Sequence, residues 1–94
     1  MESGYYTYIL YSRSLKRFYN GHSDDVDSRL KRHNACRVRS TKKGIPWNLL
    51  TQFESLTKAE AASLELRIKK RGAKRYLQDI AFSFEEAFDR CADG

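Results

Sequence analysis

Short apolar runs separated by polar turns open the chain. The run over residues 5–11 holds four tyrosines together with Thr7 and Ile9, and it is largely apolar on both faces. Aromatic and β-branched residues favour strands, and apolar character on both faces is typical of a central strand. Residues 12–16 are polar and predict a turn, and strand character resumes over residues 17–21. The two runs therefore predict a β-hairpin.

A helix is predicted after the hairpin and is expected to run to about Asn34. Ser23 or Asp24 is suited to cap it, because a short polar side chain accepts a hydrogen bond from a free backbone N–H of the first turn. Val26 and Leu30 are four residues apart, so both are expected to face the sheet.

A basic loop over residues 37–44 leads into a predicted third strand over residues 46–53. Thr57 then opens a capping-box pattern, in which a glutamate follows three residues later. The helix that starts there is expected to run to about Arg71, and Gly72 is a good stop signal.

Two more helices are expected toward the C-terminus. Residues 73–81 predict a short helix whose apolar side is Tyr76, Leu77 and Ile80, and residues 82–91 predict an amphipathic helix. The order of elements is therefore β-β-α-β-α-α with an extra C-terminal helix, which indicates an α+β fold.

Positive charge is concentrated in the body of the chain. The 94 residues carry a net charge of +6, but residues 83–94 carry −3, so residues 1–82 carry +9. A chain of this length is expected to form one domain. A body this basic favours binding to a polyanion, and nucleic acid is the commonest one. Solubility alone is the alternative explanation of the charge.

The two cysteines, Cys36 and Cys91, are far apart and form no metal-binding pattern, so free thiols and a cytoplasmic location are expected. No apolar run approaches the length of a transmembrane helix. The N-terminus also lacks the charged and apolar regions of a secretory signal. We therefore expect no contact with a membrane.

Glu65 is the first candidate for chemistry. The helix that contains it is predicted to bury a stripe through Ala61, Leu64 and Ile68, and Glu65 lies on or beside that stripe. A carboxylate at the edge of a buried face is costly unless it is paired or binds a metal. The alternative is an ordinary ion pair with Lys69, four residues later.

Arg29 and His33 are the next candidates, one helical turn apart. Arg29 lies beside the apolar face of its helix, where a guanidinium can hold a phosphate through two hydrogen bonds. His33, or the more distant His22, can act as a base or contact a phosphate. The alternatives are a solvated arginine and hydrogen-bonded structural histidines.

Tyr8 and Tyr19 lie on neighbouring strands of the predicted hairpin. If the turn centres near Ser14, the two tyrosines come close to facing each other on one side of the sheet. Packing of the two rings across the strands is the alternative reading.

The spacing of these residues resembles that of the GIY-YIG nuclease family over about residues 4–80. The first tripeptide keeps only its last tyrosine, and the second has Asn20 in place of isoleucine. More narrowly, the chain is similar to small stand-alone bacterial members and to the N-terminal nuclease domain of the excinuclease C subunit. The residues that carry the resemblance are Tyr6-Thr7-Tyr8, Tyr19-Asn20-Gly21, Arg29, Glu65 and the segment Lys42 to Trp47.

The resemblance implies a three-stranded antiparallel sheet flanked by helices, with the active site on one face of the sheet. Residues 1–82 would form the nuclease domain and residues 83–94 an acidic, aromatic C-terminal helix or tail. The implied activity is metal-dependent endonuclease hydrolysis of DNA, in a DNA-repair setting. Glu65 would hold one Mg²⁺ or Mn²⁺, Tyr19 or Tyr8 would activate or position water, and Arg29 would stabilise the phosphate. His33 would join them as a further catalytic residue.

DNA is accordingly the expected partner, with a homodimer or a targeting protein as a further expectation. The basic residues expected to contact DNA are Arg37, Arg39, Lys42, Lys43, Lys69 and Lys70. Two other readings stay open. One is a nucleic-acid-binding module of the same fold that does not cut, and the other is a structural or interaction role of residues 82–94.

Overall fold

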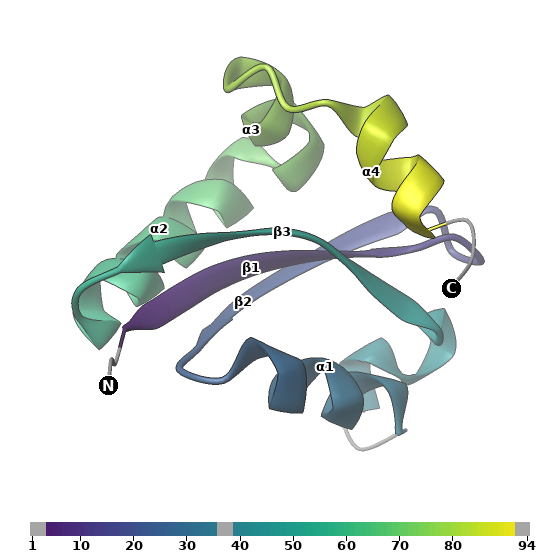
Figure 1. Ribbon diagram of the computed structural model, residues 1–94, viewed down its shortest axis with the longest axis horizontal. Coiled ribbons are helices and arrows are strands. Elements are labelled where there is room, and N and C mark those ends of the chain that lie inside the picture. Colours follow the sequence, from purple (N-terminus) through teal and green to yellow (C-terminus); the bar gives the residue numbers. More distant parts are fainter. Residues whose placement is uncertain (1–3, 36–38, 92–94) are drawn as a thin grey trace.

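The computed structural model describes residues 4–35 and 39–91 and contains one sheet of three antiparallel strands (Figure 1). Strand β1 (Tyr5–Ser12) lies in the middle, between β2 (Arg17–Ser23) and β3 (Trp47–Ser55). The predictions of an α+β fold, of a hairpin and of a central first strand are confirmed. Both outer strands extend two residues beyond the predicted ends.

Helices cover both faces of the sheet. Helix α1 lies on one face and α2, α3 and α4 lie on the other, as Figure 1 shows. Part of the predicted basic loop forms a short 3-10 helix, η1, between α1 and β3. The bounds are α1 (Val26–Asn34), η1 (Arg39–Gly44), α2 (Lys58–Arg71), α3 (Ala73–Asp79) and α4 (Phe84–Cys91).

The sheet separates two hydrophobic cores, and β1 contributes to both. Successive side chains of a strand point to opposite faces, so Tyr8 and Ile9 enter different cores and are 2% and 0% exposed. The core under α2, α3 and α4 is made of Ile9, Leu50, Ile68, Leu77 and Ala87. The core under α1 is made of Tyr8, Leu10, Val26 and Trp47.

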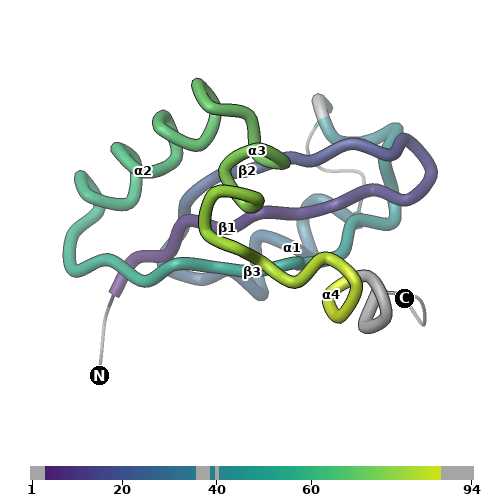
Figure 2. Tube along the Cα trace, turned by 90° about the horizontal axis from the view of Figure 1, so that it is seen from above, coloured from purple at the N-terminus to yellow at the C-terminus, as the bar shows by residue number. Residues whose placement is uncertain are grey.

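The three C-terminal helices cross one face of the sheet in succession. Figure 2 shows that α2 follows the β2 side and that α4 reaches the β3 side. Helix α4 is held by Ala87, which is 1% exposed in the same core as Ile9, and by the ring of Phe84, which lies 6.5 Å from that of Phe18. Helix α4 therefore packs on the rest of the protein through Phe84 and Ala87. Within the described part of the chain, no helix is both long enough and apolar enough to span a membrane.

Local signals in the sequence located most helix ends. Thr57 caps α2 by accepting a hydrogen bond from the backbone N–H of Glu60 at 3.1 Å, and Gly72 ends it with a φ of +93°. The predicted end of α1 at Asn34 is confirmed, but the predicted cap was wrong, because Asp25 caps the helix and accepts from the N–H of Ser28 at 3.1 Å. Strand β2 continues to Ser23, which displaces the helix start.

Two side-chain placements also differ from the sequence prediction. Ile80 is 45% exposed, because α3 ends at Asp79 and Ile80 falls beyond the buried face. In the hairpin, Tyr8 is paired with Gly21 and Tyr19 with Leu10, so the two tyrosines are not opposite each other. The turn occupies residues 13–16, and Tyr8 pairs two residues beyond Tyr19, at Gly21, so both tyrosines stay on one face.

Gly21 is required by the position of Tyr8. A Cβ atom added at Gly21 would lie 2.7 Å from the hydroxyl oxygen of Tyr8 and 2.9 Å from the ring carbon that bears it. These distances are shorter than real Cβ atoms show, so the phenol ring occupies the space that a side chain would need. The hairpin register thus makes glycine and tyrosine a matched pair.

We predict that Gly21→Ala lowers the free energy of unfolding by about 1–3 kcal/mol, because the new methyl group overpacks the core against Tyr8. Urea denaturation of the single variant measures this loss. In a Tyr8→Phe background the same substitution should cost less, because the nearest atom has been removed. An equal loss in both backgrounds would contradict the proposed contact.

Candidate active site

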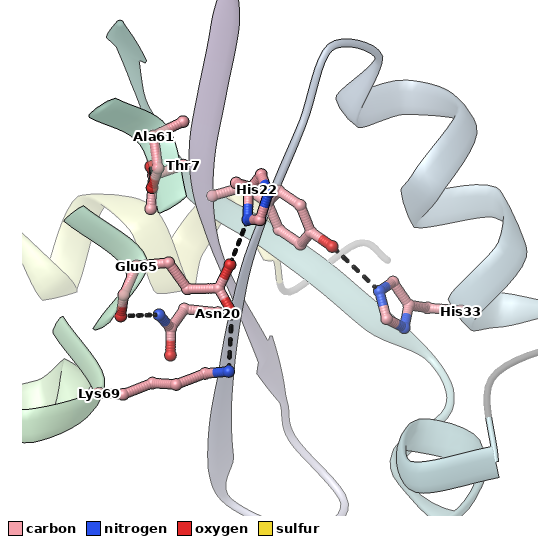
Figure 3. Close-up of polar contacts among 8 residues, drawn as sticks. Thr7, Asn20, His22, His33, Ala61, Glu65 and Lys69 are labelled. Carbon is pink, nitrogen blue, oxygen red and sulfur yellow. Dashed lines mark hydrogen bonds and ion pairs between the residues drawn. The ribbon is translucent and has the colours of Figure 1, made fainter. Parts of the chain in front are cut away.

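Glu65 lies on α2 beside the edge strand β2, with a side chain that is 16% exposed. Its Oε1 atom accepts a hydrogen bond from Nδ1 of His22 at 2.5 Å, and its Oε2 atom pairs with Nζ of Lys69 at 2.7 Å. Figure 3 shows the carboxylate between these two groups. The predicted ion pair with Lys69 is therefore present, together with a histidine contact.

Two side chains of the sheet anchor α2 through its backbone. The amide of Asn20 donates to the carbonyl oxygen of Glu65 at 3.0 Å, and the hydroxyl of Thr7 donates to that of Ala61 at 2.7 Å. The two carbonyls are one helical turn apart (Figure 3). Asn20 thus points away from the face of Tyr19, because neighbouring side chains of a strand alternate, and it fixes the position of the backbone that carries the carboxylate.

The carboxylate of Glu65 is stabilised in its charged form. Burial would raise the pKa of Glu65, but the hydrogen bonds from His22 and Lys69 outweigh burial and lower it below its usual value. The hydrogen bond with Glu65 raises the pKa of Lys69 in turn, and Tyr19 acts in the same direction. Glu65 is therefore an anion at neutral pH.

The opposite face of the sheet holds a buried chain of hydrogen bonds. His33 is 2% exposed, and its Nε2 lies 3.3 Å from the hydroxyl of Tyr8 while its Nδ1 lies 2.8 Å from the hydroxyl of Thr41. Burial lowers the pKa of His33, and the charges of Arg29 and Arg32 lower it further. His33 is therefore a neutral imidazole, with one ring nitrogen as donor and the other as acceptor.

Tyr8 stays protonated in this chain. Burial raises the pKa of Tyr8 to about 12, although the charge of Arg29 and its hydrogen bond to the phenol act in the opposite direction. A protonated phenol can donate to Nε2 of His33, which leaves Nδ1–H to donate to Thr41. Arg29, one helical turn before His33, thus lies against the phenol of Tyr8.

Tyr19 is held on the same face by two aromatic neighbours. Its ring centroid lies 5.0 Å from that of His33 and 6.1 Å from that of Trp47. Trp47 is itself fixed by Asn34, whose amide accepts from the backbone N–H of Trp47 at 2.6 Å and donates to its carbonyl at 3.0 Å. The indole N–H donates to the carbonyl oxygen of Thr41 at 2.6 Å. These contacts restrict the positions open to the Tyr19 ring.

The two groups of residues meet at β2, which is an edge strand. Figure 3 shows Glu65 on α2 on one side of the strands and His33 on α1 on the other. The charge of Glu65 contributes to the raised pKa of Tyr8, and Tyr19 contributes to the raised pKa of Lys69. The carboxylate of Glu65 therefore lies within electrostatic reach of the Tyr8 phenol, and its partner Lys69 lies within reach of Tyr19.

The predicted DNA-contact residues fall into two groups rather than one. Arg39, Lys42 and Lys43 are exposed on η1, which packs beside α1 (Figure 1). Lys69 and Lys70 are exposed on α2, on the other side of the sheet. Arg37 lies outside the described residues.

Sequence reasoning missed His22 as the partner of Glu65, and a signal for it was present. Alternation along the strand places Asn20 on the side opposite Tyr19, and it places His22 on the same side as Asn20, facing α2. Thr41 was missed as the partner of His33, and no pattern indicated it, because the path of η1 depends on its packing beside α1.

The donor set near Glu65 fits a hard divalent cation held by one carboxylate. Among the described residues, no group of three histidine, cysteine, aspartate or glutamate side chains is placed to hold a metal. Mg²⁺ is commonly bound through one or two carboxylates, with water and phosphate oxygens in its other positions. Both oxygens of Glu65 are already paired, one with His22 and one with Lys69, so a cation would have to displace one of them, and the Lys69 side chain is the more exposed at 51%.

The comparisons with known proteins agree with this geometry. A family model described as the GIY-YIG catalytic domain matches residues 4–77. The chain is also similar to the solution NMR structure of the UPF0213 protein BH0048 from Bacillus halodurans, with 27% sequence identity and a TM-score of 0.54. That match covers 90% of this chain and 93% of the other. A search of curated proteins gave no match.

We predict that His33 makes the stability of the protein depend on pH. Its lowered pKa means that the unfolded chain takes up a proton more readily than the folded one. The stability that neutral His33 contributes is therefore complete above its ordinary pKa of about 6.5. It is lost as the pH falls from there through the lowered pKa of the folded state. Urea midpoints at about pH 7.5 and about pH 5.5 should differ more for the unmodified protein than for His33→Gln. Equal pH dependence of the two proteins would contradict this account.

Proposed function

The chain belongs to the GIY-YIG catalytic domain family, whose members are nucleases, and on this premise we propose that it is a metal-dependent endonuclease that hydrolyses DNA. The observation that carries the proposal is the meeting of two groups at the β2 edge. An anionic Glu65 approaches from α2, while Arg29 and Tyr19 approach from the α1 face. Such a cluster combines a carboxylate that can hold a metal, a cation that can stabilise charge on a phosphate and a phenol that can activate or position water.

Arg29 is the residue proposed to stabilise the transition state. Attack on a phosphodiester places additional negative charge on the phosphate oxygens, and a fixed cation beside them lowers the barrier. The charge of Arg29 acts to lower the pKa of both Tyr8 and His33, so the guanidinium lies near the hydroxyl group of Tyr8 and the ring of His33. A guanidinium can hold two phosphate oxygens at once, which also orients the scissile bond.

Tyr19 is the better candidate for activating water. A tyrosine can accept a proton from water only after it has lost its own, and burial opposes this loss at Tyr8 by raising its pKa to about 12. Tyr8 is better suited to donate a hydrogen bond and to position the groups around it. Tyr19 is more accessible to solvent and substrate, because it is half-buried whereas Tyr8 is only 2% exposed.

Glu65 is proposed to hold one Mg²⁺ or Mn²⁺, with His22 orienting its carboxylate from the other oxygen. The ion, when bound, would neutralise charge on the phosphate and lower the pKa of nearby water. Asn20 contributes by fixing the backbone of Glu65, so the carboxylate is held before substrate arrives. His33 contributes by holding Tyr8 and packing against Tyr19 rather than as a charged group.

We predict that Glu65→Gln and Arg29→Ala each lower metal-dependent nicking of plasmid or branched DNA by at least about 100-fold, because each removes charge stabilisation at the phosphate. Single-turnover cleavage with Mg²⁺ or Mn²⁺ measures the loss. Glu54→Gln is the matched control, since it neutralises an exposed carboxylate on β3 and should retain the activity of the unmodified protein. Absence of metal-dependent cleavage by the unmodified protein above the Glu65→Gln background rejects the nuclease proposal for this chain.

A second candidate function is nucleic-acid binding without cleavage. It is favoured by the pairing of both carboxylate oxygens of Glu65, because a carboxylate already satisfied by His22 and Lys69 does not require a metal. Binding that falls with salt but is indifferent to Mg²⁺ and to Glu65→Gln would support this function. Metal-dependent cleavage that Glu65→Gln abolishes would exclude it.

A further inference from the structure

A groove of about 640 Å³ lies beside β2, between the hairpin turn and the junction of α2 with α3. Its wall on the sheet side is formed by Lys16, Arg17, Phe18 and Asn20. Its helical wall begins at Lys69 and continues through residues 71–75. The two walls are distant in sequence, so the groove exists only in the folded chain.

The lining of this groove is strongly cationic. Six of its side chains are lysine or arginine, and no aspartate or glutamate is among the described residues that line it. Arg71 is neutralised by an ion pair with Asp79, and Lys69 by Glu65. The other four are exposed and form no ion pair with any described carboxylate: Lys16, Arg17, Lys74 and Arg75. Four exposed cations that face one space favour binding of a polyanion, although the charge of Arg75 also acts on the carboxylate of Asp79.

The groove is continuous with the candidate active site. Lys69 lines it and also contacts the carboxylate of Glu65, and Asn20 lines it while donating to the backbone of Glu65. An anionic chain with one phosphate at Glu65 can therefore extend along β2 into the groove without crossing an acidic part of its described lining. An acidic patch on a partner protein would also match the charge, but the junction with a phosphate-handling site favours nucleic acid.

The aromatic residue of the groove is not free to stack on bases. Phe18 is half-buried, and its ring packs 4.9 Å from Tyr11 and 6.5 Å from Phe84. The remaining groups suited to recognition are cationic side chains, which contact phosphates and carry no sequence information. The chemistry of the groove therefore indicates contact with the backbone rather than reading of bases.

We propose that this groove binds backbone phosphates of the DNA next to the scissile one, through Lys16, Arg17, Lys74 and Arg75. The proposal rests on the proposed function, because it places the scissile phosphate at Glu65. It implies that the DNA passes around the β2 edge, from the α1 face with Tyr19 to the α2–α3 face. The residues predicted from the sequence on η1 would then serve the other arm of the substrate.

The test is the salt dependence of DNA binding, measured by fluorescence anisotropy in a chelator so that no cleavage occurs. We compare Lys74→Gln/Arg75→Gln from the helical wall and Lys16→Gln/Arg17→Gln from the hairpin wall with the unmodified protein. The matched control is Lys31→Gln/Lys58→Gln, which removes two exposed charges away from the groove. Thermal unfolding checks that each variant is folded.

Each groove pair should weaken binding equally on two unrelated DNA sequences and reduce the slope of log affinity against log salt by about two, because each cation contributes about one phosphate contact. The control pair should leave the slope near that of the unmodified protein. A slope unchanged by both groove pairs, or lowered as much by the control pair, overturns the proposal and leaves the groove to another anionic partner. Because binding is measured without metal, a chain that never cleaves DNA can still support or reject the groove.

Discussion

Burial of β1 on both faces is the constraint on which the rest of the structure depends. Because side chains alternate along a strand, Tyr8 and Leu10 belong to the core under α1, while Thr7 and Ile9 face α2. Both cores must form for this strand to be covered, so α1 and α2 are held in place by alternate residues of one strand. The distance between Arg29 on one helix and Glu65 on the other is thereby set by the sheet between them.

The position of β2 at the edge turns this layered arrangement into a site. Were β2 covered by another strand, Glu65 would be separated from the tyrosines by the full sheet. At the edge, the carboxylate meets His22 on β2 and acts electrostatically on Tyr8 across the strand. Gly21 on β2 is also needed for this arrangement, since its missing side chain leaves the space that the Tyr8 phenol fills. The contacts that stabilise the fold around β2 therefore also position the residues of the candidate site.

The sequence alone supported the elements, their order, the α+β class and the family, because these depend on local patterns. Alternation predicted β1, the capping box at Thr57 located α2, and spacing grouped Arg29 with Glu65 as candidates. The same reasoning failed where one residue decides the outcome. The hairpin turn is centred slightly later than expected, so Tyr8 faces Gly21 instead of approaching Tyr19. The cap of α1 moved to Asp25 because β2 is longer than its pattern indicated.

Only the tertiary structure decided which partners these residues have. Periodicity left Glu65 between an ion pair and a functional role, and the fold supplied His22 from a strand 43 positions away in addition to Lys69. It buried His33 against Thr41, which makes that histidine a neutral support. It also joined the hairpin turn to the α2–α3 junction as one cationic groove. Local sequence determines the backbone conformations that neighbours favour, whereas pKa values and binding surfaces depend on distances between segments that meet only on folding.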